Sequence, residues 1–242
     1  MSFEHPNRNN ESMRDVELDI MSRPPEHNTT NLDLDRMNLM LDILGHPEQS
    51  FRVIHITGTN GKGSTARMAE AICRAYGMRT GLYTSPHLEK INERIAIDGQ
   101  QLSDDDFIDI WDQTKDLVAL VDAKMEEQGK PKMSFFEVLT AMAIWKFADT
   151  PVDVAIVEVG MGGLWDATNV LSADAAIIGP VDMDHMQWLG DTVEQIATER
   201  PASSSRTAPP SSARSRMRKP SCRFSPKPPN ATTPCSCATA TK

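Results

Sequence analysis

Two hydrophobic periods alternate along the chain between residues 32 and 198. Short apolar runs predict strands, and apolar residues spaced three or four positions apart predict helices. The predicted strands cover residues 51–56, 80–83, 152–159 and 175–178. The predicted helices cover residues 32–44, 66–76, a long stretch from 103 onward, 134–147 and 192–198. Strands that alternate with helices indicate an α/β fold, with a mostly parallel sheet flanked by helices.

Local signals sharpen three of these elements. Asp98-Gly99 lies between two short extended segments, 94–97 and 100–102, and predicts a hairpin turn. Ser103 precedes three aspartates, which is typical of a helix N-terminus. The run at 152–159 is almost unbroken in its apolar residues, as expected of a strand covered on both faces.

Composition divides the chain into three parts. Residues 1–28 are polar and aperiodic, and they predict a mobile N-terminal extension. Residues 29–199 carry the alternating pattern and form the predicted domain. Residues 200–242 lack any period and hold eight of the 16 prolines, so they predict a disordered tail.

The charges are distributed unevenly between the tail and the rest of the chain. Residues 200–242 contain nine Lys or Arg and no acid, which leaves 16 basic and 34 acidic side chains elsewhere, a net charge of −18. An acidic domain is a poor nucleic-acid binder, so we expect small-molecule partners and no nucleic acid. We also expect a monomer.

The cysteine content and the lengths of the apolar runs indicate the cellular compartment of the protein. Cys73 is the sole cysteine outside the tail, which argues for a reducing cytoplasm and against a disulfide scaffold. No apolar run is long enough to span a membrane, and the polar N-terminus lacks the apolar core of a signal peptide. The sequence therefore predicts a cytoplasmic protein without a membrane partner.

The strongest chemical signal is V-I-H-I-T-G-T-N-G-K-G-S at residues 53–64. It joins a predicted strand to a predicted helix through a glycine-rich loop. Such loops turn backbone N–H groups toward phosphate oxygens, and the helix N-terminus adds partial positive charge. Lys62 supplies a full charge and Ser64 a hydroxyl for magnesium. The pattern differs from G-x-x-x-x-G-K-[ST], because residue 56 is Ile, and an ordinary turn is the alternative interpretation.

Two further residues follow predicted strands at the edge where ligands bind in α/β sheets. Glu158 ends a buried strand and precedes Gly160-Met-Gly-Gly163, so it is a candidate magnesium ligand. A solvated acid at a strand end is the alternative. His185 lies just after another strand, where a ligand role and a packed or surface histidine both remain open. Asp166 and Asn169 either cap a helix or meet substrate.

These pieces together resemble one family, the folate branch of the Mur-type amide ligases, which comprises dihydrofolate synthase and folylpolyglutamate synthase. The resemblance rests on six segments: H-I-T-G-T-N-G-K-G-S (55–64), T-S-P-H-L (84–88), S-F-F-E (134–137), V-E-V-G-M-G-G (157–163), D-A-T-N (166–169) and D-H-M-Q-W-L-G-D-T (184–192). One departure is Leu164-Trp165, where many members carry Arg-Leu.

The resemblance implies a fold like the Mur ligase central domain and an ATP-dependent reaction. ATP, with magnesium, phosphorylates a carboxylate of dihydropteroate or folate, and L-glutamate attacks the acyl phosphate. The implied nucleotide contacts are Thr59, Asn60, Gly61, Lys62, Gly63 and Ser64. The implied magnesium ligands are Ser64, Ser85, Glu158 and His185, with catalytic roles for Lys62, Glu158 and His185. The implied pterin or benzoate contacts are Phe135, Phe136, Glu137, Asp166 and Ala167.

The resemblance stops at residue 200. The family continues with a helix that reads roughly I-A-x-E-K-A-G-I, whereas this chain reads Ile196-Ala-Thr-Glu199 and then Arg200-Pro-Ala-Ser. If one nucleotide is missing at codon 200, restoring it shifts the reading frame. The segment from Glu199 can then be translated as E-K-A-G-I-I-K-P, followed by an amphipathic pattern. We therefore interpret residues 200–242 as an out-of-frame tail, an interpretation that an in-frame nucleotide sequence across codon 200 would refute.

This break affects the expected activity. The family's lysine at this point becomes carbamylated, but a guanidinium stays protonated and does not readily carry a carbamate. We expect the chain as written to lack the C-terminal glutamate-ligase domain and to be a truncated, inactive form. The alternatives are a vestigial nucleotide-binding fragment without catalysis and a Mur-type ligase for another substrate.

Overall fold

The computed structural model describes residues 12–25, 33–161 and 165–180. The predicted helix at 192–198, His185 and the tail at 200–242 lie outside the described residues. The structural statements that follow concern the described part alone.

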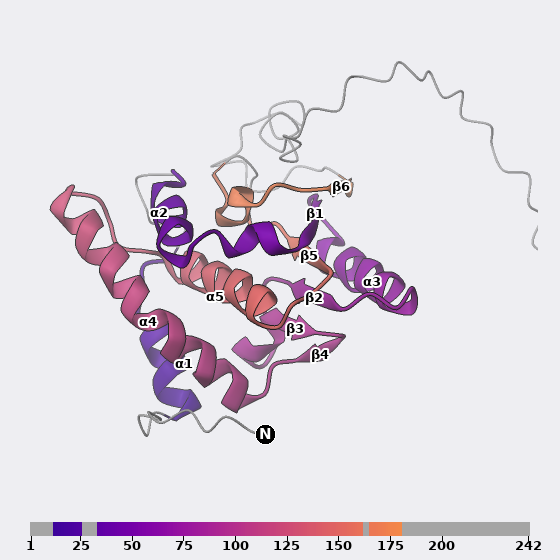
Figure 1. The fold of residues 1–242 in the computed structure, drawn as a ribbon, viewed down its shortest axis with the longest axis horizontal. Helices are drawn as coiled ribbons and strands as arrows, with labels where there is room; N and C mark the ends of the chain where they lie inside the picture. The colour runs from indigo at the N-terminus through magenta and orange to yellow at the C-terminus, as the bar shows by residue number, and fades with distance from the viewer. Residues whose placement is uncertain (1–11, 26–32, 162–164, 181–242) are drawn as a thin grey trace, which may run out of the picture. The chain divides into compact units, whose positions relative to one another are not determined.

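A six-stranded sheet in the order β4-β3-β2-β5-β1-β6 forms the centre of the described domain (Figure 1). Four strands are parallel, and β3 and β4 form an antiparallel edge. The strands are β1 (Arg52–Thr57), β2 (Thr80–Tyr83), β3 (Ile95–Ile97), β4 (Gln100–Gln101), β5 (Val154–Glu158) and β6 (Ala175–Ile178). The predicted mostly parallel α/β sheet is confirmed.

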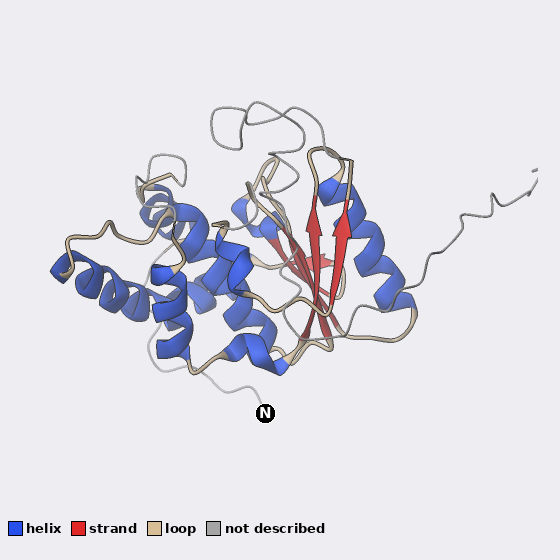
Figure 2. Cartoon of the chain, turned by 90° about the horizontal axis from the view of Figure 1, so that it is seen from above, coloured by secondary structure: helices blue, strands red, loops and turns tan. Residues whose placement is uncertain are grey.

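Helices cover both faces of this sheet (Figure 2). Helix α3 packs on one face, and α5 packs on the other with α1, α2 and α4 behind it. The helices are α1 (Met13–Met21), α2 (Asp35–Leu44), α3 (Lys62–Ala75), α4 (Asp104–Glu127) and α5 (Phe135–Asp149). Short 3-10 helices are η2 (Pro47–Ser50), η3 (Ile91–Arg94) and η4 (Ala167–Val170). All five residues of β5 are buried, as predicted for a strand covered on both faces.

The turn and cap signals of the sequence are confirmed. Asp98 and Gly99 both have positive φ, 49° and 77°, as a type I′ hairpin turn between β3 and β4 requires. The hydroxyls of Ser103 and Ser134 accept backbone N–H bonds at the starts of α4 and α5. Helix α3 begins four residues earlier than the predicted 66, because Gly61 adopts a left-handed cap with φ 78°.

The predicted extension at residues 1–28 is wrong over Met13–Met21, which forms α1. Ser12 and Asp15 make a capping box at its start, and Val16 and Ile20 are buried against α4 and α5. The helical signal is weak because the apolar stripe is only one or two side chains wide. Tertiary packing of that stripe therefore decides a segment that looks disordered by composition.

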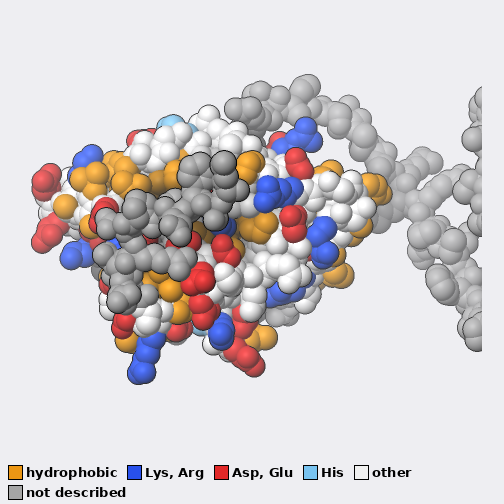
Figure 3. All heavy atoms as spheres, turned by 60° about the horizontal axis from the view of Figure 1, so that its bottom comes forward, with side chains coloured by type: hydrophobic (Ala, Val, Ile, Leu, Met, Phe, Trp, Pro, Cys, Tyr) orange, Lys and Arg blue, Asp and Glu red, His pale blue; other side chains and the backbone are white. Residues whose placement is uncertain are grey.

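The described surface mixes charges of both signs. On the face in Figure 3, acidic and basic side chains are interspersed, with apolar groups between them. Within the described residues, no helix combines the length and the apolar character needed to cross a membrane.

Candidate nucleotide and substrate site

The glycine-rich loop lies at the carboxyl end of β1, where β6 supports it. Thr59 N–H donates to Pro180 O at 2.9 Å, and Gly179 N–H donates to Thr57 O at 2.7 Å. Gly58 has a φ of 145°, and a Cβ there would lie 3.0 Å from Gly179 Cα. The loop needs glycine at this position because the two backbones approach too closely for a side chain.

The loop leads directly into the first turn of α3, which contains Lys62, Gly63 and Ser64. Backbone N–H groups of a first helical turn have no intrahelical acceptor, and the helix dipole favours an anion beside them. Lys62 Nζ donates to Gly58 O at 3.1 Å and to Thr59 O at 3.2 Å, so the lysine folds over the loop. These features form an anion-binding cradle.

Glu158 lies beside this cradle because β5 is the neighbour of β1 in the sheet. Its Cα pairs with Ile56, and its side chain points to the α3 face. Glu158 Oε2 accepts the Ser85 N–H at 3.1 Å and lies 3.2 Å from the point where a Gly63 Cβ would be. Burial raises the pKa of Glu158, while the Ser85 N–H and the charges of Lys62, Arg67 and Arg94 act to lower it.

The donor set at this edge fits magnesium. The hydroxyls of Ser64 and Ser85 and the carboxylate of Glu158 are hard oxygen donors that would hold it, and Gly63 leaves room for the carboxylate. Among the described residues, no three His, Cys, Asp or Glu side chains cluster as a protein-only metal site would require. A cation here would thus share its coordination with hydroxyls, water and nucleotide oxygens. His185, the fourth predicted ligand, lies outside the described residues.

A cavity of about 470 Å³ lies next to the cradle; Ser85 lines the cavity and donates its N–H to Glu158 beside the cradle. Its volume falls within the range of small-molecule sites, and most of its lining is apolar. The lining residues are Met21, Arg23, Pro25, Ser85, Pro86, Arg94, Phe135, Phe136, Gly160 and Met161.

The aromatic wall of the cavity is tightly packed. The ring of Phe136 lies 5.8 Å from that of Tyr83, between ring centroids. A Cβ on Gly160 would come within 2.5 Å of Phe136 Cζ, so glycine is required there. The guanidinium of Arg94 lies 5.1 Å from the centroid of Phe135. Phe135 and Phe136, predicted as substrate contacts, therefore do line the cavity.

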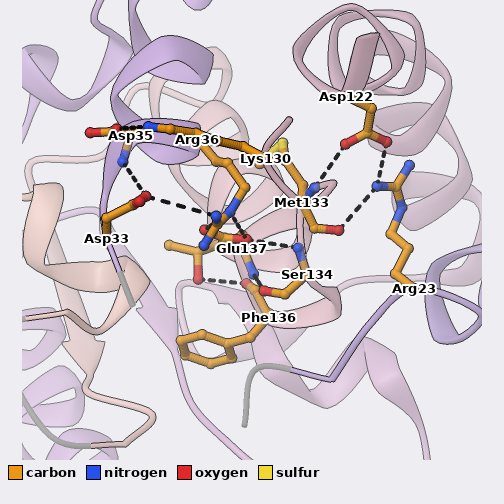
Figure 4. A network of polar contacts seen from close by, with 11 residues as sticks. Arg23, Asp33, Asp35, Arg36, Asp122, Lys130, Met133, Ser134, Phe136 and Glu137 are labelled. Carbon is orange, nitrogen blue, oxygen red and sulfur yellow. Dashed lines mark hydrogen bonds and ion pairs between the residues drawn. The ribbon is translucent and has the colours of Figure 1, made fainter. Parts of the chain in front are cut away.

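Glu137 is the first of three predicted substrate residues that lie outside this lining. Its carboxylate accepts Arg36 Nε at 2.9 and 3.0 Å and the Ser134 N–H at 2.7 Å, as Figure 4 shows. It thus joins α2 to the start of α5, where Phe135 and Phe136 lie. Its carboxylate is thus occupied by contacts within the protein, and the substrate contact stays a prediction.

Asp166 and Ala167 are buried beneath the cavity wall. Asp166 accepts the N–H of Met161 at 2.8 Å and of Thr168 at 3.0 Å, together with the Thr168 hydroxyl. Burial raises the pKa of Asp166. Since Met161 lines the cavity, Asp166 holds the wall in place, and it also caps η4 as the sequence allowed.

Several lining residues carried no usable sequence signal. Arg94 lies in an I-N-E-R-I segment whose charge resembles that of a solvated loop, yet only 7% of it is exposed. Met21 ends α1, a helix that the composition does not indicate, and Arg23 and Pro25 follow it. The Phe135 N–H donates to Pro24 O at 3.0 Å. Near Pro86, the sequence indicates a site only through the T-S-P-H-L segment that the chain shares with the family.

The chain was compared with known proteins. No model of a protein family matches it. It is 48% identical over 194 residues to the dihydrofolate synthase/folylpolyglutamate synthase of Mycobacterium tuberculosis, covering 78% of this chain and 39% of that protein. The protein of the same name from Bacillus subtilis is 39% identical over 168 residues, covering 69% and 38% respectively.

Solved structures give the same result. Folylpolyglutamate synthase of Mycobacterium tuberculosis, complexed with ADP and AMPPCP, matches with a TM-score of 0.71 and 47% identity, over 78% of this chain and 40% of that one. An FPGS–AMPPCP–folate complex matches with a TM-score of 0.72 and 35% identity, over 78% and 45%.

The fold and the cradle define an α/β domain with a phosphate-loop-type turn between β1 and α3. The chain belongs to the dihydrofolate synthase/folylpolyglutamate synthase family, of which it carries the N-terminal portion. It spans about two-fifths of the length of the curated relatives it matches.

Proposed function

We propose that the described domain binds ATP with magnesium at the loop and a pteroate-type carboxylic acid in the adjoining cavity. In the complete enzyme, ATP would activate that carboxylate for amide formation with L-glutamate. The observation that carries this proposal is Ser85, which lines the cavity and also donates its N–H to Glu158 at the cradle. A carboxylate at this junction would lie between the aromatic wall and the terminal phosphate.

The proposed reaction has two steps. A carboxylate oxygen attacks the γ-phosphorus, the bond to the β,γ-bridging oxygen breaks, and ADP leaves. The amine of glutamate then attacks the acyl carbon, phosphate leaves, and the nitrogen loses its proton to solvent or a base. Magnesium, when bound, would neutralise charge on the transferred phosphoryl group.

The residues of the chain supply binding and orientation. The N–H groups at the start of α3 and the Lys62 ammonium would hold the phosphates, as Lys62 exchanges its two loop carbonyls for phosphate oxygens. Phe135 and Phe136 would hold the flat rings of the substrate away from water. Fixing both reactants at one junction lowers the entropic part of the barrier.

Ligand binding to the purified chain tests the proposal. Titration with AMPPCP and magnesium, and separately with pteroate, should give saturable binding to the wild-type protein. Lys62→Met should weaken AMPPCP binding by about tenfold or more, because a charge-assisted contact is lost. Lys124→Met removes an exposed lysine on α4 and serves as the matched control. Absence of AMPPCP binding by the wild-type chain would contradict the proposal.

The transfer of glutamate is predicted separately from the binding of AMPPCP and pteroate. From Arg200 we predict no glutamate-dependent ADP release by this chain. Measurable release with pteroate, ATP and glutamate would refute that prediction and leave the binding proposal intact. The cytoplasmic location and the monomeric state stay predictions.

A further inference from the structure

One wall of the cavity comes from the end of α1 and the residues after it. Met21, Arg23 and Pro25 line the cavity, and residues 21–25 are called the α1 wall below. The other lining residues lie after β2, at the end of η3, at the start of α5 and after β5. Among the described lining residues, those of the α1 wall alone precede the glycine-rich loop in the chain.

Met21 is a large apolar residue that remains exposed. Its exposed fraction is 52%, whereas Val16 and Ile20 of the same helix are 1% and 0% exposed. Because Met21 lines the cavity, a ring bound there would remove part of this apolar surface from water. Methionine also adapts its shape to its surroundings and makes favourable contacts between its sulfur and aromatic rings. Met21 is therefore suited to contact a flat ligand.

The α1 wall is anchored to the rest of the domain at two points. Arg23 Nη1 is ion-paired with Asp122 Oδ2 on α4 at 3.0 Å, and it also donates to Met133 O at 3.3 Å (Figure 4). The Phe135 N–H donates to Pro24 O at 3.0 Å. The position of the α1 wall relative to the start of α5 is thus fixed.

Asp122 connects the two sides of this junction. It does not line the cavity, and only 7% of it is exposed. While its Oδ2 pairs with Arg23, its Oδ1 accepts the Met133 N–H at 2.8 Å. Since Met133 lies two residues before Phe135, Asp122 holds the α1 wall and the aromatic wall of the cavity together.

We propose that the α1 wall is part of the ligand site, where Met21 contacts the flat rings of the bound acid and Asp122 is a positioning residue for Met21. This inference rests on the proposed function, since it adds a contact to the ligand proposed for that cavity. Ser85 lies at the side of the cavity next to the cradle, whereas the α1 wall is tied to α4 and α5. Met21 therefore contacts the ring system, while the carboxylate lies at Ser85.

Substitutions of Met21 test the contact, with AMPPCP as an internal reference. Met21→Ala should weaken pteroate binding by about fivefold or more, because apolar contact with the rings is lost. Met21→Leu keeps the apolar volume and should bind pteroate within about twofold of the wild type. Leu18→Ala is the matched control, since Leu18 is an exposed apolar residue of the same helix outside the cavity lining. It should leave pteroate affinity unchanged, and all three variants should bind AMPPCP as the wild type does.

A double-mutant cycle tests the positioning role of Asp122. Asp122→Asn keeps the shape of the side chain and removes the charge that pairs with Arg23. It should weaken pteroate binding by about fivefold in the wild-type background but by less than about twofold in Met21→Ala, because both residues act through one contact. A purely structural role would give the same factor in both backgrounds. Circular dichroism and thermal midpoints establish that each variant is folded.

The outcomes separate this inference from the proposed function. Wild-type affinity of Met21→Ala for pteroate overturns the inference and keeps the proposed substrate class. Equal factors for Asp122→Asn in the two backgrounds overturn its positioning role, and if Asp122→Asn does not fold, the Met21 variants alone decide. Failure of the wild-type chain to bind pteroate overturns the proposed substrate class and, with it, this inference.

Discussion

At the scale of single residues, His55 combines strong burial with a titratable ring. It lies on β1, three residues before Gly58, with 4% of it exposed and Nε2 placed 2.8 Å from Thr168 Oγ1. Burial lowers its pKa to about 4. The neutral ring is therefore part of the folded structure at pH 7.

This shift predicts a pH dependence of stability. As the pH falls from 6.5 toward 4, His55 becomes protonated in the unfolded chain but stays neutral in the folded chain. The free energy of unfolding therefore decreases. The loss attributable to His55 is about 3 kcal/mol, and above pH 6.5 it vanishes. Urea unfolding at several pH values measures it as the difference between wild type and His55→Gln.

The comparison with His55→Gln is needed because Asp166 changes the free energy of unfolding in the opposite direction as the pH falls. Burial raises the pKa of Asp166, so the folded state gains stability relative to the unfolded state as that carboxyl becomes protonated. The prediction would be contradicted if the free energy of unfolding depended on pH in the same way in the wild type and in His55→Gln.

Gly63 offers a second residue-scale prediction. Alanine is favoured over glycine inside a helix by up to about 1 kcal/mol, so Gly63→Ala should not destabilise the fold. The added Cβ would lie 3.2 Å from Glu158 Oε2 and would crowd the proposed magnesium position. We expect magnesium-dependent AMPPCP affinity to fall by about tenfold or more, or about 1.4 kcal/mol.

Calorimetric titration with and without magnesium measures this effect. Met68→Ala alters an exposed residue on the same helix and should leave affinity unchanged. Undiminished magnesium-dependent binding by Gly63→Ala would argue against a cation between Gly63 and Glu158.

The sequence predicted Lys62, Ser64 and Glu158 because each follows a strand or a glycine at a recognisable spacing. It did not predict that Arg94 lines the cavity, where its guanidinium lies over Phe135, a residue 41 positions away in the chain. The substrate contact of Glu137 follows only from the family resemblance, and its partner Arg36 lies 101 residues earlier in the chain. Long-range pairing of this kind leaves no local pattern.

At the scale of elements, the Arg36–Glu137 pair fixes α2 against α5. Both side chains are almost fully buried, at 3% and 6% exposed. Arg36→Met would leave the Glu137 carboxylate buried without its cation, and we expect a loss of about 3 kcal/mol or more in the free energy of unfolding. Urea denaturation provides the measurement.

Lys130→Met supplies the control for this pair. It removes the neighbouring ion pair with Asp35, which also joins α2 to the segment before α5 but is more exposed (Figure 4). Its loss should cost less than about 1 kcal/mol. Equal effects of the two substitutions would show that burial does not decide the strength of these contacts.

The elements that the sequence predicted well are those whose signal is local. The strand at 80–83 and the strand at 175–178 match β2 and β6, and Asp98-Gly99 forms its hairpin turn. Helix α1 was missed because its stability comes from packing two side chains on α4 and α5. The early start of α3 was missed because glycine lowers helix propensity, while the loop geometry favours a helix there.

At the scale of the whole molecule, the two proposed ligands should stabilise the fold separately. A ligand at 100 times its dissociation constant adds about 2.7 kcal/mol to the free energy of unfolding. Thermal midpoints should rise with AMPPCP and magnesium, and rise again with pteroate.

The Lys62→Met variant identifies the site that produces the first increment. It should lower the AMPPCP increment by about 1.4 kcal/mol or more and leave the pteroate increment unchanged. A loss of both increments in this variant would indicate one combined site in place of two adjoining sites.

The sheet order carries a consequence for the way this domain forms during synthesis. Strands β1 and β2 do not pair with one another, because β5 lies between them. Pairing of β1 with β5 must wait until the chain has grown past Glu158, about 100 residues beyond β1, and such distant contacts slow folding. A growing chain that ends before β5 exposes two unpaired strand edges, which are prone to aggregate. The glycine-rich loop is synthesised early, yet it gains its acidic neighbour only when the central strand arrives.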